Sequence, residues 1–277
     1  MIVAVLLVAV VCIAGAYLVV GNDKKENVTI NAWGSTTVSP LMMELYTNYH
    51  KEHGNVTINI GGNGSGEAYN ALINGTADIG MLSRALNASE PATPLKIASD
   101  AVVMIIDKNA GVTDLTLEQL AKIYAGEYTN WNEVGGNTLK IEPLVRESTS
   151  GTRACVNAIL GPKVGMTERQ FDELKVDKRY SVKGTEGHML TDAQNTTGAI
   201  GYVGLGASTN IGSSMTALSV GGVTPSKDTI LNGTYSISRP LFLATLGEPN
   251  EEVKAFLDWI ISPAGQKIVD DMGFVPI

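Results

Sequence analysis

The chain reads Arg146-Glu147-Ser148-Thr149-Ser150-Gly151-Thr152-Arg153 between a predicted strand at 139–145 and a predicted helix at 154–160. The first backbone N–H groups of a helix have no partner within it, and the helix dipole adds partial positive charge there. The hydroxyls of Ser150 and Thr152 add donors, and Gly151 permits close approach to the backbone. The Arg146 guanidinium offers a planar fork of N–H groups. Such groups bind a tetrahedral oxyanion, although an ordinary capped helix in a Ser/Thr-rich loop explains the stretch equally well.

The same arrangement occurs twice more near the start of the chain. A predicted strand at 28–32 runs into the loop 34–40, and a helix follows. Another strand at 56–60 opens into the Gly-rich loop 61–66, before a helix at 67–74. Because strand, Gly/hydroxyl loop and helix alternate, the sequence predicts an α/β fold with a mainly parallel sheet. Ligands of such sheets bind beyond the carboxyl ends of the strands, where these loops would lie.

The rest of the chain holds further predicted elements. Strands are predicted within 75–84 and at 101–107, 198–204 and 240–246, and helices at 117–125, 167–174, 186–194, 252–261 and 263–272. Residues 205–235 are weakly patterned, and we predict only strands there. The apolar tail, 274–277, is predicted to dock on the fold.

Composition limits the class of protein. With 277 residues, 44% of them hydrophobic and 17% charged, the chain is predicted to fold into one large globular domain or two ordinary ones. A formal net charge of −8 argues against nucleic acid as a partner. The overall field also does not attract anions, so any anion site must be built locally.

Catalytic motifs are not evident in the sequence. Ser65 lacks the frame of a nucleophile elbow, because Asn63 and Glu67 stand where its outer glycines belong. The same loop lacks the lysine of a P-loop and the third glycine of a dinucleotide fingerprint. No zinc-peptidase spacing occurs among the three histidines, His50, His53 and His188. A phosphatase-like enzyme would need a metal cluster or a nucleophile–base pair, so we predict a protein that is not an enzyme, without metal or cofactor.

An apolar run at residues 2–20 precedes the polar segment 21–26. Its length is close to the ~20 residues of a membrane-spanning helix, which favours an uncleaved anchor. A signal peptide cut after Ala14-Gly15-Ala16 is the alternative. Lipid modification at Cys12 is a third, disfavoured by the preceding Val11. All three place the rest of the chain outside the cytoplasmic membrane, anchored or secreted, and residues 1–26 form a separate N-terminal membrane anchor or signal segment.

A series of motifs resembles that of the phosphate-binding proteins, the extracytoplasmic receptors of ABC-type phosphate importers. The motifs are Gly34 to Pro40, Gly64-Ser65-Gly66, Gly75 to Gly80, Arg146 to Arg153, Gly198 to Gly204 and Ser238-Arg239-Pro240-Leu241. The segment Ser262 to Val269 is similar to the last helix of that family. The resemblance spans about residue 28 to the end of the chain.

This resemblance implies a two-lobed periplasmic-binding-protein fold of type II. Two α/β domains would be joined by two crossing strands, one of them near 102–107, with the ligand cleft between them. Lobe I would comprise 27–104 plus 240–277, and lobe II 105–239. The resemblance also implies a monomer that binds inorganic phosphate and delivers it to the permease subunits of the importer. Receptors for sulfate, molybdate or tungstate remain the alternative, as does an adhesion or signalling module that has lost its ligand.

By position in the motifs, the resemblance also implies a phosphate-binding shell. Its members are Thr36, Thr37, Ser65, Ser83, Arg84, Arg146, Ser150, Gly151 and Thr152. One position departs from part of the family, because some members have an aspartate where this chain has Ser83. That carboxylate accepts the proton of hydrogen phosphate, which sulfate lacks. Arg84 would add a second positive charge, and Glu147 is the candidate for a substitute acceptor.

Overall fold

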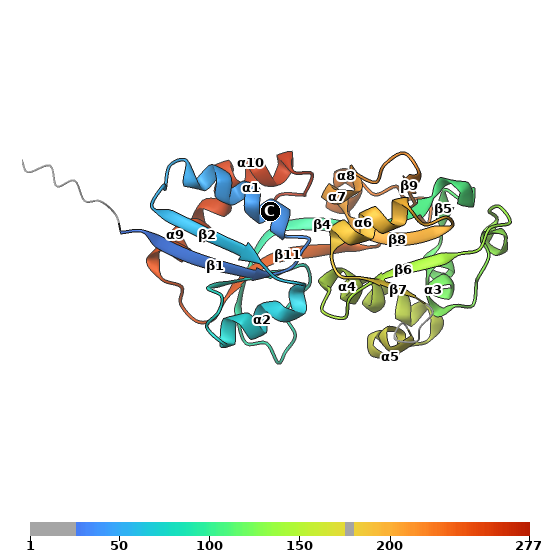
Figure 1. Cartoon of the computed structure of the whole chain (residues 1–277), viewed down its shortest axis with the longest axis horizontal. Helices are drawn as coiled ribbons and strands as arrows, with labels where there is room; N and C mark the ends of the chain where they lie inside the picture. The colour runs from blue at the N-terminus through green and yellow to red at the C-terminus, as the bar shows by residue number, and fades with distance from the viewer. Residues whose placement is uncertain (1–25, 175–179) are drawn as a thin grey trace, which may run out of the picture.

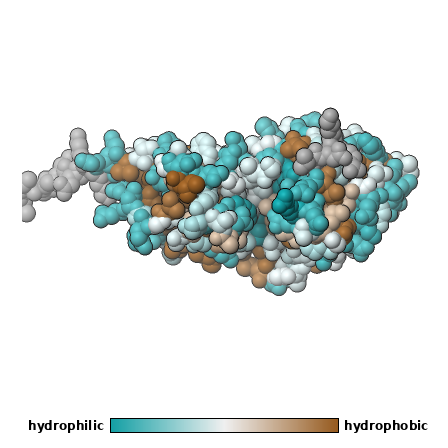
Figure 2. All heavy atoms as spheres, turned by 90° about the horizontal axis from the view of Figure 1, so that it is seen from below, coloured by the Kyte–Doolittle hydropathy of each residue, from teal (hydrophilic) through white to brown (hydrophobic). Residues whose placement is uncertain are grey.

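The computed structural model describes residues 26–174 and 180–277. Two α/β lobes lie side by side, and helices cover both sides of the sheet in each (Figure 1). All but the last residue of the predicted segment 1–26 lies outside the described ranges. Within those ranges, no helix is long and apolar enough to cross a membrane. Hydrophilic residues cover most of the face in Figure 2, with hydrophobic ones in small groups.

The first lobe contains a parallel sheet completed by one antiparallel strand. Its strands run in the order β2-β1-β3-β11, with β1 parallel to both neighbours and β11 antiparallel to β3. The elements are β1 (Val28–Gly34), α1 (Ser39–His50), β2 (Val56–Gly61), α2 (Ser65–Ile73), β3 (Ile79–Leu82), β11 (Ser238–Thr245), α9 (Glu251–Ile260) and α10 (Pro263–Asp271). The loops after β1, β2 and β3 therefore meet at one edge of the sheet, as predicted.

The second lobe has a similar plan. Its strands run in the order β4-β8-β6-β7, where β4 spans Thr93–Asp107. β6 is parallel to β7 and β8, and β4 also pairs with β9. The elements are β5 (Asp114–Leu115), α3 (Leu117–Ala125), β6 (Glu142–Arg146), α4 (Gly151–Leu160), α5 (Glu168–Glu173), β7 (Ser181–Lys183), α6 (Glu186–Gln194), β8 (Ala199–Gly204), α7 (Leu205–Ser208), β9 (Met215–Ala217), β10 (Ser219–Val220) and α8 (Lys227–Leu231), with 3-10 turns at Lys108–Ala110, Trp131–Val134 and Gly161–Val164.

Two antiparallel strands cross between the lobes. β4 (Thr93–Asp107) packs Ile97 and Ala98 into the core of the first lobe, and residues 101–106 into the core of the second. Its partner is β11, with Arg239 opposite Asp100. The chain thus leaves the first lobe near Asp100, a few residues before the crossing predicted at 102–107. We propose this position as the first boundary between the lobes, in place of the predicted residue 104. The second boundary, where the chain re-enters the first lobe, stays between residues 239 and 240.

Most predicted elements are confirmed within a few residues, with three corrections. β4 begins at Thr93 rather than 101, because its polar first half is paired with β11. The helix predicted at 154 begins at Gly151, since the Ser150 hydroxyl accepts from the Arg153 N–H and caps it. The region 205–235 contains the short helices α7 and α8, not only strands. The tail is docked as predicted, with Val275 paired to Ser99.

Candidate functional site

Arg146 stands at the end of β6, where the two lobes meet, and its side chain is 1% exposed. The Nε and Nη2 groups donate to the two carboxylate oxygens of Glu147 at 2.9 and 2.8 Å. Nη2 also donates to Thr36 Oγ1, from the first lobe, at 2.8 Å. Nη1 is buried and has no hydrogen-bond partner among the described residues. Since a buried donor without an acceptor is costly, this nitrogen points to an anionic ligand.

Two neighbours, Tyr202 and Arg153, hold the backbone of Arg146 in place. Its backbone N–H donates to the Tyr202 hydroxyl at 3.0 Å, and burial raises the pKa of Tyr202 to about 12, so the phenol stays neutral. The carbonyl of Arg146 accepts from Arg153 Nη1 at 2.7 Å. Arg153 in turn pairs with Asp172 at 2.6 Å. None of these contacts uses the Arg146 guanidinium, so the position of the Arg146 backbone does not depend on the charge of its side chain.

The start of α4 faces the hydroxyls of the first lobe. A Cβ atom at Gly151 would overlap Ser65 Oγ and lie 2.6 Å from Ser83 Oγ. These two hydroxyl oxygens are 3.2 Å apart, and the Ser83 N–H donates to Ser65 Oγ at 3.0 Å. Only glycine permits such an approach, so the free N–H groups at this helix start lie against polar side chains of the other lobe.

A second buried arginine lies beside the threonines. Arg239 Nη1 donates to Thr152 Oγ1 at 2.6 Å, and Nη2 reaches Thr37 Oγ1 at 3.5 Å. The two threonine oxygens, one from each lobe, are 3.2 Å apart. The Thr37 hydroxyl also donates to Glu186 Oε1 at 3.3 Å. Arg239 itself is anchored by Asp100 at 2.9 Å on the other crossing strand.

Further contacts show that the lobes are closed on each other. The Thr149 hydroxyl donates to the Asn63 carbonyl at 2.9 Å, and the Gly66 N–H donates to the Thr149 carbonyl at 2.8 Å. Gly64, which precedes α2, has φ +135°, and a Cβ there would lie 2.6 Å from the Thr149 carbonyl oxygen. The Gly-rich loop predicted as an anion cradle thus packs directly against the loop that follows β6.

The structure brings together all but one of the predicted shell residues. Clustered at the interface are Thr36, Thr37, Ser65, Ser83, Arg146, Ser150, Gly151 and Thr152. Arg84 is not directed into this cluster. Its two Nη groups donate to the Glu90 carboxylate at 2.7 Å each, and Nη1 also donates to the Ala85 carbonyl. Glu147, the predicted substitute acceptor, has both oxygens bonded to Arg146.

Sequence reasoning gave no role to three buried charged residues of the site, Asp100, Glu186 and Arg239. Arg239 lies in the motif 238–241, which could have indicated it. Asp100 and Glu186 carry no local signal, because a carboxylate at a helix start or in a strand is common on protein surfaces. Only the packing of the two lobes makes them part of the site.

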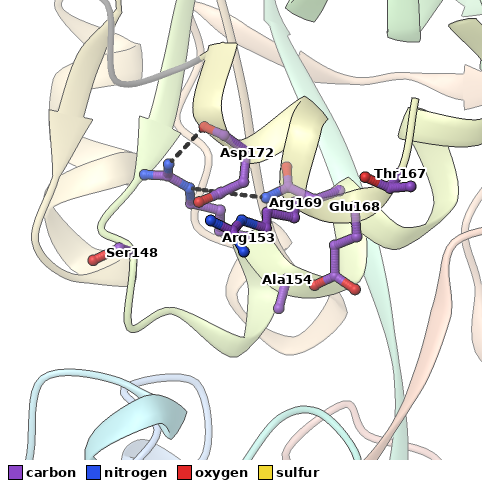
Figure 3. A pocket seen from close by; sticks show the side chains of 8 residues that line it. Ser148, Arg153, Ala154, Thr167, Glu168, Arg169 and Asp172 are labelled. Atoms are coloured by element: carbon purple, nitrogen blue, oxygen red, sulfur yellow. Dashed lines mark hydrogen bonds and ion pairs between the residues drawn. The ribbon is translucent and has the colours of Figure 1, made fainter.

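A separate cavity of about 400 Å³ lies on the second lobe, between α4 and α5 (Figure 3). Arg153 and Asp172 point toward one another across it, joined by the ion pair described above. Arg169 at its rim is 88% exposed and pairs with Glu173 on its own helix. The arginines here are therefore engaged or solvated, unlike Arg146 Nη1. Among the described residues, no group of three or more His, Cys, Asp or Glu side chains is placed to hold a metal ion.

Comparison with known proteins assigns the family. A family model described as PBP superfamily domain matches residues 21–264. The phosphate-binding protein PstS of Borreliella burgdorferi is 33% identical over 92% of each chain, and the PstS of Bacillus subtilis is 29% identical over 92% of this chain and 83% of its own. The chain belongs to the PstS family of the PBP superfamily.

Solved structures of PstS-like receptors have the same two-lobed fold. A Clostridium perfringens substrate-binding protein, crystallised with bound phosphate, superposes with a TM-score of 0.82 at 31% identity, covering 90% of this chain and all of its own. An ABC-type phosphate transport receptor from Vibrio cholerae has a TM-score of 0.73 at 30% identity, with the same coverage. These relatives are substrate-binding proteins of transporters.

Proposed function

We propose that this protein binds inorganic phosphate in the cleft between its lobes, outside the cytoplasmic membrane, and delivers it to the permease of an ABC-type importer. The observation that carries the proposal is the buried Nη1 of Arg146, which has no hydrogen-bond partner in the part of the chain that the structure describes. It lies in a cluster of hydroxyls and helix N-termini that can donate to a tetrahedral anion. Membership of the PstS family supports phosphate as that anion.

The closed geometry explains how binding would be retained. Thr36 and Ser65 come from the first lobe, whereas Gly151 and Thr152 come from the second, so the complete shell exists only when the lobes meet. Donors from both lobes replace the hydration shell of the ion, and the ion in turn satisfies Arg146. Binding and closure are therefore coupled, and reopening at the permease releases the ion. In this role the protein acts by binding alone, as a monomer and without a cofactor.

The N-terminal segment completes the proposed arrangement. An anchor formed by residues 1–26 would keep the receptor at the outer face of the cytoplasmic membrane, beside the permease. Cleavage of this segment would instead release the receptor from the membrane. Separation of cell membranes from the medium, followed by detection of the protein, distinguishes the two cases. An anchored receptor is found with the membranes, and a cleaved one is found apart from them.

Calorimetry on residues 27–277 tests the ligand. Phosphate is expected to bind more tightly than sulfate, molybdate or tungstate. Ser83 supplies a hydroxyl where a carboxylate would repel sulfate, so a sulfate receptor is the competing candidate. Equal or tighter binding of any of the other three ions would contradict the proposal.

A further inference from the structure

The positive charges at the cleft are already balanced by the protein itself. Arg146 is bonded through two of its nitrogens to Glu147. Arg239 is bonded through two of its nitrogens to Asp100, and both side chains of this pair are almost completely buried. Each arginine thus has its own carboxylate. An incoming anion therefore meets two neutral pairs, not an excess of positive charge.

A third carboxyl group, Glu186, has no such partner. It is the first residue of α6 and is only 5% exposed. Its Oε1 accepts from the Gly204 N–H at 2.6 Å and from the Thr37 hydroxyl at 3.3 Å. Both donors are neutral, and within the described ranges no cation lies within ion-pair distance of this carboxylate.

Glu186 is close to the proposed anion position. The Thr37 oxygen that it contacts lies 3.2 Å from Thr152 Oγ1, at the start of α4. A Cβ atom placed on Gly204 would lie 2.9 Å from Asp100 Oδ2, 3.3 Å from Glu186 Oε1 and 3.2 Å from a methyl carbon of Thr37. One hydroxyl group therefore separates this carboxyl group from the helix start that faces the ion.

Titratable groups near Glu186 come from the strands packed against α6 and from the crossing strand β11. They are Asp100 on β4, Arg146 on β6, Lys183 on β7, which pairs with Asp192, Tyr202 on β8 as a neutral phenol, and Arg239 on β11. Burial raises the pKa of Glu186 and Asp100 adds to that rise, whereas Arg239, the Gly204 N–H and Arg146 lower it, and the net direction is upward.

Burial raises the pKa of Asp100 too, whereas Arg239 and the Leu205 N–H lower it. With Asp100 and Glu186 both ionised, the two arginines and the three carboxylates Glu147, Asp100 and Glu186 give the cleft a net charge of −1. Protonation of Glu186 brings this sum to zero. Because an anion placed nearby favours the neutral form of a carboxyl group, binding of the ion and protonation of Glu186 support each other.

We propose that Glu186 takes up one proton when the anion enters the cleft, so that phosphate and a proton bind together. The inference rests on the proposed function. The proton comes from solvent and goes to the Glu186 carboxylate, and the protons of the phosphate ion itself are not transferred. Uptake occurs between the pKa of Glu186 in the free protein and its higher pKa in the complex. Below this window the group is already protonated, and above it the group stays ionised in both states.

Calorimetry in buffers of different ionisation enthalpy counts the protons taken up per phosphate bound. The proteins compared are the wild type, Glu186→Gln and Glu173→Gln, a matched control that loses the same charge on the exposed face of α5. Phosphate's own protonation contributes equally to all three, so the difference between variants belongs to the residue. In titrations run from about pH 5 to 9, the wild type and the control are expected to take up as much as one more proton than Glu186→Gln inside the window. In the same window their affinity is expected to fall with rising pH by as much as tenfold more per pH unit than that of the variant.

Equal proton numbers for wild type and Glu186→Gln across this range would overturn the inference and leave phosphate binding standing. Failure of the wild type to bind phosphate would remove the proposed function as well. If Glu186→Gln does not fold, infrared difference spectra of the wild type with and without phosphate replace it. A protonated-carboxyl band is expected to appear on binding within the window, and its absence over the whole range would overturn the inference.

Discussion

Arg146→Ala is expected to abolish tight phosphate binding and leave the fold intact. The substitution removes the buried Nη1, which has no hydrogen-bond partner among the described residues, together with the bond from Nη2 to Thr36 across the cleft. The contacts that hold this residue in β6, from Tyr202 and Arg153, use its backbone and remain. The secondary structure should therefore be unchanged, whereas affinity for the ion falls.

The expected loss of phosphate affinity follows from the charges of Arg146, Glu147 and the bound anion. A hydrogen bond to a charged group contributes about 1.5–3 kcal/mol. Loss of Arg146 also leaves Glu147 without its partner beside the bound anion, which adds repulsion. Together these effects amount to about 3 kcal/mol, or roughly a hundredfold increase in Kd. The double variant Arg146→Ala with Glu147→Gln removes the repulsive part and should recover about tenfold of the loss.

Calorimetry with phosphate measures these values, and circular dichroism checks the fold. Arg169→Ala is the matched control, because it removes the same charge from an 88% exposed position on α5. The control should bind phosphate as the wild type does. The assignment of this arginine to the site would be refuted if folded Arg146→Ala bound phosphate with a Kd within about threefold of the wild-type value. Such a change is less than ~1 kcal/mol of binding free energy.

Three further predictions concern closure and selectivity. Phosphate should reduce the radius of gyration in small-angle scattering, because the contact from Thr149 to Asn63 requires closed lobes. If neither the radius of gyration nor the thermal stability changed, closure of the two lobes on the ion would be excluded. Gly151→Ala should weaken phosphate binding in calorimetry by tenfold or more, since the Cβ of alanine would overlap Ser65 Oγ in the closed form. Wild-type affinity in this variant would show that the start of α4 does not approach Ser65 this closely in the complex. Discrimination against sulfate should be weaker than in family members with an aspartate at the position of Ser83. Ser83→Asp should increase this discrimination, because a carboxylate repels an ion that carries no proton. An unchanged ratio of phosphate to sulfate affinity in competition binding would contradict this.

The loops of the site could be predicted because their chemistry is local. In 34–40, 61–66 and 146–153, a β-branched strand leads into glycine and hydroxyl residues and then a helix, and each part of the signal lies within about twenty residues. Since the carboxyl ends of parallel strands meet at one edge, the sequence also indicated that the loops 34–40 and 61–66 come together. The loop 146–153 follows a strand of the other lobe and meets them because the lobes are closed. The motif series then identified the family.

The remaining features depend on contacts that are distant in sequence or on side-chain competition. Arg84 resembles a ligand residue in sequence, but Glu90, six residues later, binds its guanidinium. Glu186 resembles an ordinary acidic residue at a helix start, and only its contact with Thr37, 149 residues away, places it at the cleft. The first half of β4 lacks strand periodicity because its first four residues are not buried and are held by pairing with β11, and its buried residues Ile97 and Ala98 are adjacent rather than alternating.

A crystal structure with arsenate, a tetrahedral anion with a strong anomalous signal, tests the central claim most directly. The account predicts one arsenic peak between the lobes, with an arsenate oxygen in hydrogen-bond distance of Arg146 Nη1 and the start of α4 at Gly151. A peak in the cavity between α4 and α5 near Arg169, and none between the lobes, would contradict it.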